Sequence, residues 1–222
     1  MAIAFIAATA SSSAATVGTA FTVTYSPTNG NKIVLGGSFS GTIGNPTCTD
    51  NNANALTLIA TAGAGHMVQF YGTASSNPTA YTLNWVTSSK ASAILGEYAG
   101  PTSSGAVATA SATSTTPTVS LIETGANSFN VAVIMSQGNV TFTQATGTLR
   151  GQVSAGAGNA NSIALVDNSG LSAGNTITCA CTVSNTTWFA AGLEIIPPAG
   201  GGGGGSNWLG VSLAQGWNKH GG

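Results

Sequence analysis

Alternation of apolar and polar residues with a period of two is the feature that most restricts the fold of this chain. Tyr81, Leu83 and Trp85, for example, are separated by single polar residues and would share one face of a strand. No part of the sequence has the apolar spacing of a convincing helix. The pattern therefore predicts an all-β protein built as an antiparallel β-sandwich.

Segments rich in β-branched and aromatic residues alternate with turn-forming residues along the chain. The segment 129–135 is apolar on both faces, which indicates a strand at the centre of a sheet. Residues 146–160 are mostly small, and we expect a loop there. In chain order, the expected strands are 1–10, 21–25, 32–39, 56–61, 67–71, 81–87, 91–98, 118–122, 128–135, 140–144, 162–166, 176–183 and 188–196.

A shift of 97 residues places expected strands of the first half on expected strands of the second half, and Glu97 on Glu194. Two architectures would produce this internal pseudo-repeat. One is a single sandwich with pseudo-twofold symmetry, and the other is a pair of tandem sandwiches, 1–100 and 118–198, joined by a Ser/Thr/Ala/Gly-rich linker. We favour a single body over residues 1–198, because the first half has few large apolar residues to close a core alone.

Six consecutive glycines at 200–205 separate this body from the end of the chain. Glycine has no side chain to pack and loses the most backbone entropy on ordering, so 199–206 is predicted to be a linker. Residues 207–222 are then a flexible tail, whose large apolar groups are candidate anchors for docking in a groove. The alternatives are a tail that folds back on its own sandwich and a tail without fixed structure. The candidate anchors are Trp208, Leu209, Val211, Leu213 and Trp217.

Charged residues are unusually rare in this chain. It has four Lys and Arg and five Asp and Glu residues among 222, with a net charge of −1, whereas about a quarter of the residues of an ordinary domain are charged. Long-range electrostatic attraction to nucleic acid or to an anionic membrane is therefore not available. We expect neither nucleic acid nor a membrane to be a partner of this protein. Near-zero net charge promotes association, which makes further copies of the chain the first expected partner.

The N-terminal segment is apolar but does not have the features of a signal peptide. It carries no Lys or Arg before its short apolar run, so we expect a strand. No apolar run is long enough to span a bilayer. We therefore expect a protein made in a cytoplasm with a surface suited to the outside, two conditions that virion proteins satisfy because they leave the cell by lysis.

Catalytic, cofactor and metal chemistry have little support in the sequence. Cys48, Cys179 and Cys181 are odd in number and are expected to be small buried apolar groups. His66 and His220 do not have the spacing of metal ligands, so no metal is expected.

Glu97 and Glu194 are the acids that call for a structural explanation. Each lies near the end of an apolar strand, where a buried carboxylate needs a partner. We expect hydrogen bonds or salt bridges at the rim of the sandwich, with Lys90 and Arg150 as candidate partners.

The order of the strand and turn motifs resembles a group of β-sandwich proteins encoded by tailed phages and by some bacteria. The likeness covers about residues 1–198, and its motifs are structural ones. The resemblance implies a phage virion component with a jelly-roll-like or immunoglobulin-like antiparallel β-sandwich, such as a capsid decoration or fibre protein, and it brings no catalytic residues. The motifs are the Met-Ala-Ile-Ala-Phe start, Gly30 to Leu35, Thr47 to Asn51, Phe70-Tyr71, Tyr81 to Trp85 and Gly96 to Gly100.

The sequence therefore predicts a non-enzymatic structural protein of a virus particle, found in the virion. Its expected partners are further copies of itself and the major capsid protein or another virion protein. A first alternative is a carbohydrate-binding module or adhesin with a glycan ligand, which would expose aromatic residues such as Tyr71, Tyr81, Trp85 or Tyr98 on one sheet face. A second is a bacterial surface-layer or filament subunit, which would need export.

Overall fold

The computed structural model describes residues 2–12, 18–154, 161–170 and 172–198. The described chain forms sixteen strands and one short 3-10 turn, without an α-helix, which confirms the all-β prediction. No helix in this part of the chain is long and apolar enough to cross a membrane.

The first eight strands lie in the first half of the chain and the last eight in the second half. The first half contains β1 (Ala4–Ser12), β2 (Gly18–Thr24), β3 (Lys32–Phe39), β4 (Thr47–Asp50), β5 (Ala55–Ala62), β6 (Met67–Thr73), β7 (Ala80–Ser89) and β8 (Ala91–Ala99). The second half contains β9 (Ser103–Ser114), β10 (Thr118–Ile122), β11 (Phe129–Gln137), β12 (Thr143–Thr146), β13 (Thr148–Val153), β14 (Asn161–Ser169), β15 (Thr176–Thr182) and β16 (Thr186–Ile196).

Each half has the strand order of an eight-stranded jelly roll. The first half is one sheet in the order β1-β8-β3-β6-β5-β4-β7-β2, folded over so that its two ends face each other across an apolar cluster. The second half repeats this order as β9-β16-β11-β14-β13 and β12-β15-β10, except that β12 and β13 are not paired. An immunoglobulin-like sandwich would distribute its strands between its two sheets in a different order, so the strand order identifies each half as a jelly roll.

The register of the strands repeats as well as their order. The β3–β8 pair sets Lys32 opposite Tyr98, and the β11–β16 pair sets Phe129 opposite Ile195, which in both cases is 97 residues later. On β14 the shift is 96 residues, since Val34 lies opposite Tyr71 while Val131 lies opposite Asp167. The pseudo-repeat expected from the sequence is thus visible in the topology and register of the described strands.

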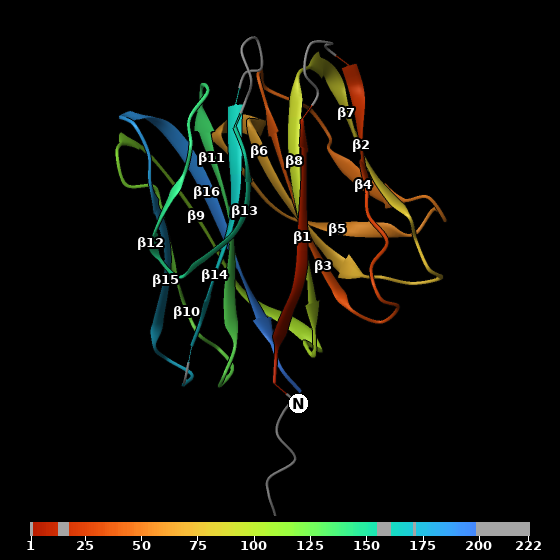
Figure 1. Cartoon of the computed structure of the whole chain (residues 1–222), viewed down its shortest axis with the longest axis vertical. Helices are drawn as coiled ribbons and strands as arrows, with labels where there is room; N and C mark the ends of the chain where they lie inside the picture. Colours follow the sequence, from red (N-terminus) through yellow and green to blue (C-terminus); the bar gives the residue numbers. More distant parts are fainter. Residues whose placement is uncertain (1, 13–17, 155–160, 171, 199–222) are drawn as a thin grey trace, which may run out of the picture.

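The two jelly rolls pack back to back and form four layers (Figure 1). From left to right, Figure 1 shows β10, β12 and β15, then the five-stranded sheet of the second half, then β1, β8, β3 and β6, and last β2, β4 and β7. Strand β5 connects the last two layers, because it contributes to the cluster between the halves and to the cluster inside the first half. Three apolar clusters fill the three gaps between these layers, one inside each jelly roll and one between them.

Each half pairs its strands only within itself, whereas a single sandwich would share its sheets between the two halves. Among the described strands, none from residues 4–99 pairs with one from residues 103–196. The first half closes a core of its own, because one apolar cluster contains only its residues, and in addition one face of its β1-β8-β3-β6 sheet is buried against the second half. The expectation that the first half has too few large apolar residues to close a core alone is therefore wrong, since Phe39, Tyr81 and Trp85 all belong to its own cluster.

A pseudo-twofold axis relates the two halves across their interface. Strand β1 packs on β13 and β5 on β9, while β8 packs on β14 and β6 on β16. Exchanging each strand for its counterpart eight strands later turns these pairs into one another, and β3 and β11 pack together near the axis. The arrangement is that of an isologous interface between two copies of one domain.

Two glycines allow the facing sheets to approach closely. A Cβ atom on Gly36 would lie 2.4 Å from Cγ1 of Val133, and one on Gly96 would lie 2.5 Å from Cδ2 of Leu165. The side chains of the second half occupy the space that these glycines leave. Strand β11, between β14 and β16, is buried on both faces, as the apolar segment 129–135 predicts.

Two segments expected to be irregular contain strands. The expected linker 101–117 contains β9, whose Ala108 and Ala110 pack against the core of the second half. The expected loop 146–160 begins with the end of β12 and contains β13, where Leu149 and Val153 contact apolar clusters. Small residues were sufficient in both places, because edge strands bury little side-chain area.

Candidate functional site

Glu97 and Glu194, the two expected rim carboxylates, occupy equivalent places in the two jelly rolls. Glu97 lies on β8 opposite a bulge in β1, and Glu194 lies on β16 opposite a bulge in β9. Their exposed fractions are only 2% and 0%. Each carboxylate therefore depends on the protein for its hydrogen bonds.

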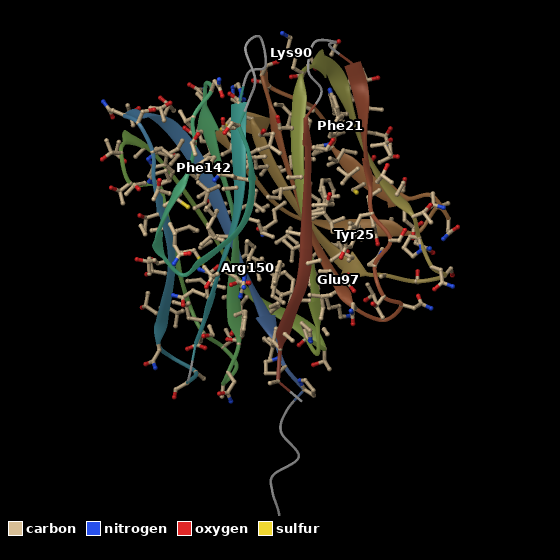
Figure 2. The ribbon with its side chains drawn as sticks, in the orientation of Figure 1. Phe21, Tyr25, Lys90, Glu97, Phe142 and Arg150 are labelled. Atoms are coloured by element: carbon tan, nitrogen blue, oxygen red, sulfur yellow. The ribbon has the colours of Figure 1, made fainter. Side chains whose placement is uncertain are left out.

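Glu97 holds the connection between β2 and β3 against the sheet. Its Oε1 accepts hydrogen bonds from the Thr28 backbone N–H (2.9 Å) and from Nδ2 of Asn31, and its Oε2 accepts one from the Tyr25 hydroxyl. Figure 2 shows Tyr25 and Glu97 close together in the first half. Burial alone would raise the pKa of Glu97, but the hydrogen bonds from Tyr25, Asn31 and Thr28 outweigh it and lower the pKa.

Glu194 holds the connection between β10 and β11 in the same way. Its Oε1 accepts hydrogen bonds from the backbone N–H groups of Thr124 (2.8 Å) and Gly125 (3.0 Å) and from Oγ of Ser128 (2.7 Å). Its Oε2 accepts from Oγ1 of Thr124 (2.7 Å) and from the Ala106 N–H (2.9 Å). Burial opposes ionisation here too, but these hydrogen bonds lower the pKa of Glu194 to about 2.

The donors themselves repeat between the halves. Gly125 and Ser128 stand 97 residues after Thr28 and Asn31, and in each pair the first donates its backbone N–H and the second donates from its side chain. The two glutamates therefore play the same role in the two halves, because each accepts hydrogen bonds from the equivalent loop. A carboxylate with its oxygens engaged and its pKa lowered is poorly placed to exchange protons with a substrate near neutral pH.

Arg150, one of the two candidate partners for these glutamates, instead binds Asp167 at the interface between the halves. Its Nε lies 2.8 Å from Oδ2 and 2.9 Å from Oδ1 of Asp167, and the Tyr98 hydroxyl donates to Oδ2 at 3.1 Å. The guanidinium also lies 4.4 Å from the centre of the Phe5 ring. Burial raises the pKa of Asp167, which Arg150 and Tyr98 only partly oppose. In Figure 2, Arg150 lies near the middle of the molecule, consistent with a role in joining the halves.

The histidine and cysteine residues that the structure describes have structural surroundings. The ring of His66 stacks on Phe189 with centroids 5.9 Å apart, and its Nδ1 lies 3.2 Å from the Phe39 carbonyl oxygen. Burial raises the pKa of Cys48 and of Cys181 to about 12, and that of Cys179 is raised as well. Neutral buried thiols are poor nucleophiles. Within the described ranges, no three His, Cys, Asp or Glu side chains are grouped so as to hold a metal ion.

The aromatic residues that an adhesin would present are inside the protein. Tyr71 is only 8% exposed, and Tyr81, Trp85 and Tyr98 are buried as well. Tyr81 and Trp85 face the core of the first jelly roll, whereas Tyr71 and Tyr98 face the second half. These four residues therefore do not form a platform on which a sugar could stack.

The candidate docking residues of the tail, from Trp208 to Trp217, lie outside the described residues. The described surface offers a different kind of contact, because it is rich in hydroxyl groups. Oγ1 of Thr22 on β2 and Oγ1 of Thr82 on β7 lie 2.9 Å apart in the outer layer of the first half. Oγ of Ser120 and Oγ1 of Thr178 lie 2.8 Å apart in that of the second half.

Strand β9 is the feature of this surface that sequence reasoning missed. It pairs with β16 on one side only, among the strands that the structure describes. The signal that could have found it is the run of alternating alanines from Ala106 to Ala112, which gives a strand one small, packable face. Its hydroxyl-rich composition instead suggested a linker.

Comparison with protein-family models, curated proteins and solved structures found no match to this chain.

Proposed function

We propose that this protein is a non-enzymatic structural component of a virus particle, a capsid decoration or surface fibre protein. The observation that carries the proposal is the pair of jelly rolls with one strand order, packed back to back into a single body. Jelly rolls are used by viral capsid proteins, and also by lectins and cupins. The fold alone therefore does not distinguish a capsid protein from a lectin or a cupin, and the proposal also depends on the chemistry of the side chains.

The side chains of the described residues favour a structural role. Of the five acids that are buried among the described residues, Glu97 and Glu194 hold loops against their sheets and Asp167 binds Arg150 at the interface between the halves. The aromatic residues expected of a sugar-binding face are buried. Most of what remains on the surface is hydroxyl, amide and small apolar groups, with little charge.

A nearly uncharged surface suits a protein that is packed among many copies of itself. With a net charge of −1 on 222 residues, neighbouring copies do not repel one another appreciably. Many weak contacts in a repeated array together give strong attachment, so no single interface has to be tight. The proposed partners are further copies of this chain and the major capsid protein or another virion protein.

Imaging of purified particles tests this proposal. We expect electron cryomicroscopy of particles that carry this protein to show a four-layered body repeated with the symmetry of the capsid or of a fibre. Particles from a strain lacking the gene should lose that density and no other. Symmetric reconstructions with no density of this shape would overturn the proposal.

A further inference from the structure

We propose that the outer edge of β9 is a strand-pairing site at which a second copy of this chain binds antiparallel, about a twofold axis. The pairing would join the five-stranded sheets of two copies into one continuous sheet. A role for this pairing in a particle rests on the proposed function. The pairing itself can be tested with the purified protein alone.

The edge of β9 is long and unpaired. At 12 residues β9 is the longest strand that the structure describes, and it pairs only with β16 among the described strands. A bulge near Ala106, whose N–H binds Glu194, interrupts the ladder at one end, which leaves residues 107–114 as a regular edge. The outward N–H and C=O groups of such an edge form a template for another strand.

The side chains of β9 do not protect this edge. Natural proteins usually blunt an exposed edge with Lys, other charges or Pro. Residues 103–114 contain none of these, and Pro101 and Pro117 lie outside the strand. Val107, Thr109, Ser111 and Thr113 are exposed. Within β9, therefore, neither a charge nor a proline opposes the pairing of another strand along this edge.

A second copy fits this edge because β9 is compatible with itself. Antiparallel self-pairing places small and hydroxyl-bearing residues opposite one another, and Thr–Thr and Thr–Ser pairs across strands are favourable. No charge is brought opposite a like charge or removed from water. The resulting contact is isologous and closed, so it yields a dimer.

The first test compares two double variants of the full chain with the same change in charge. Thr109→Lys with Ser111→Lys adds two positive charges to each chain, so that four would meet at the proposed contact of a dimer. The control, Thr176→Lys with Thr182→Lys, also adds two to each chain, but on the outer face of β15, the middle strand of its sheet. Sedimentation velocity should show a concentration-dependent dimer for the natural chain and for the control. The edge variant should dimerise at least about tenfold more weakly, because like charges would face each other.

A second test locates the contact directly. Single cysteines at Val107, Thr109, Ser111 and Thr113 are oxidised mildly, with Thr176→Cys as the control. One or two neighbouring positions near the centre of the edge should give a covalent dimer, because only residues near a twofold axis meet their own copies. The native cysteines are buried and should not contribute.

Three results would overturn the inference. The first is a natural chain that is monomeric at every concentration, which is the outcome expected if another part of the same chain covers the edge. The second is an edge variant that dimerises as strongly as the control. The third is the absence of a covalent dimer at every cysteine position on β9. None of these results bears on the proposed virion role, which is decided by the composition and imaging of particles.

Discussion

Glu194 shows how this fold accommodates a fully buried carboxylate without a basic partner. Four residues, Ala106, Thr124, Gly125 and Ser128, donate hydrogen bonds to it, and three of them donate backbone N–H groups. These N–H groups belong to loop and bulge positions that have no strand partner to satisfy them. The carboxylate thus supplies an acceptor for backbone N–H groups that would otherwise be unpaired, and these N–H groups stabilise its buried negative charge.

Replacing Glu194 by Gln should therefore be costly although the shape of the side chain is kept. The amide nitrogen cannot accept a hydrogen bond, so donors at one of the two oxygen positions lose their acceptor. We expect the free energy of unfolding to fall by about 3 kcal/mol, as for a charge-assisted hydrogen bond lost in a buried site. Urea unfolding of the variant measures this loss.

Glu97→Gln is the matched comparison for this substitution. Only one of its donors, Thr28, is a backbone group, and the side chains of Tyr25 and Asn31 can reorient. We expect a smaller loss, about 2 kcal/mol. Equal losses, or a larger one at Glu97, would mean that the backbone donors are not what makes Glu194 important.

The stability of the protein should depend on the ionisation of Glu194 in acid. The pKa of Glu194 in the folded state, about 2, is below its ordinary value of 4.5, so the unfolded chain takes up the proton first as the pH falls. The stabilisation is fully present above about pH 4.5 and is lost as the pH falls towards 2. The raised pKa of Asp167 has the opposite sign, because its contribution is lost as the pH rises through its folded value.

Comparison of the natural chain with Glu194→Gln isolates the effect of Glu194, since Asp167 and Glu97 are common to both. The difference in the free energy of unfolding should be constant above about pH 4.5 and should shrink between about pH 4.5 and pH 2. Urea unfolding at a series of pH values provides the measurement. A difference that is independent of pH over that window would contradict the proposed role of the charge.

At the scale of single residues, the sequence was informative about position and not about partners. The shift of 97 residues and the apolar neighbours identified Glu97 and Glu194 as a pair. The donors could not be foreseen, because most of those around Glu194 are backbone groups, which any sequence carries. The pairing of Arg150 with Asp167 depends on the register of β13 against β14, which composition does not reveal.

At the scale of elements, strong alternation was predictive and small residues were misleading. The segments 32–39 and 118–122 form strands with the expected bounds, β3 and β10. Strands β4, β9 and β13 were missed because they carry few large apolar residues. In β9, the alanines are enough because the strand lies at a sheet edge, where only one face packs on the core of its own half.

The close approach of β3 and β11 gives a prediction at this scale. Gly36→Ala would place a methyl group where Cγ1 of Val133 is only 2.4 Å away, so the sheets or the valine must shift. We expect a loss of about 2 kcal/mol in the free energy of unfolding, typical of an overpacked core. Gly41→Ala is the control, because its Cβ would meet no atom closer than 4.0 Å.

A double variant separates steric crowding from other effects of Gly36→Ala. Val133→Ala removes the two methyl groups that the new Cβ would meet. If crowding between the halves is the cause, Gly36→Ala should cost clearly less in the Val133→Ala background than alone. Additive losses would show that the two residues do not meet as described.

At the scale of the whole molecule, the cluster between the halves should make the two jelly rolls unfold together. The β1-β8-β3-β6 part of the first half's sheet and the five-stranded sheet of the second half each have one face in their own jelly roll and the other face buried against each other. Separation of the halves would expose a large apolar surface, so neither half should persist alone. We expect one calorimetric transition whose calorimetric and van't Hoff enthalpies agree.

Two resolved transitions, or a calorimetric enthalpy about twice the van't Hoff value, would contradict this expectation and would mean that the halves are independent domains. Gly36→Ala provides an internal check, because it lies in the first half but should lower the single transition as a whole. The same cooperativity would give a particle component a rigid body, with contacts to neighbours made at its edges and surface.

The protein content of purified particles shows whether this chain is a component of a virus particle, as proposed. Particles are banded on a density gradient, and the peptides of this chain and of the major capsid protein are counted by quantitative mass spectrometry. We expect the chain to follow the particles through the gradient, in many copies and in a fixed ratio to the capsid protein. Recovery of the chain only in the soluble fraction of the lysate, with none in the particle band, would contradict the proposal.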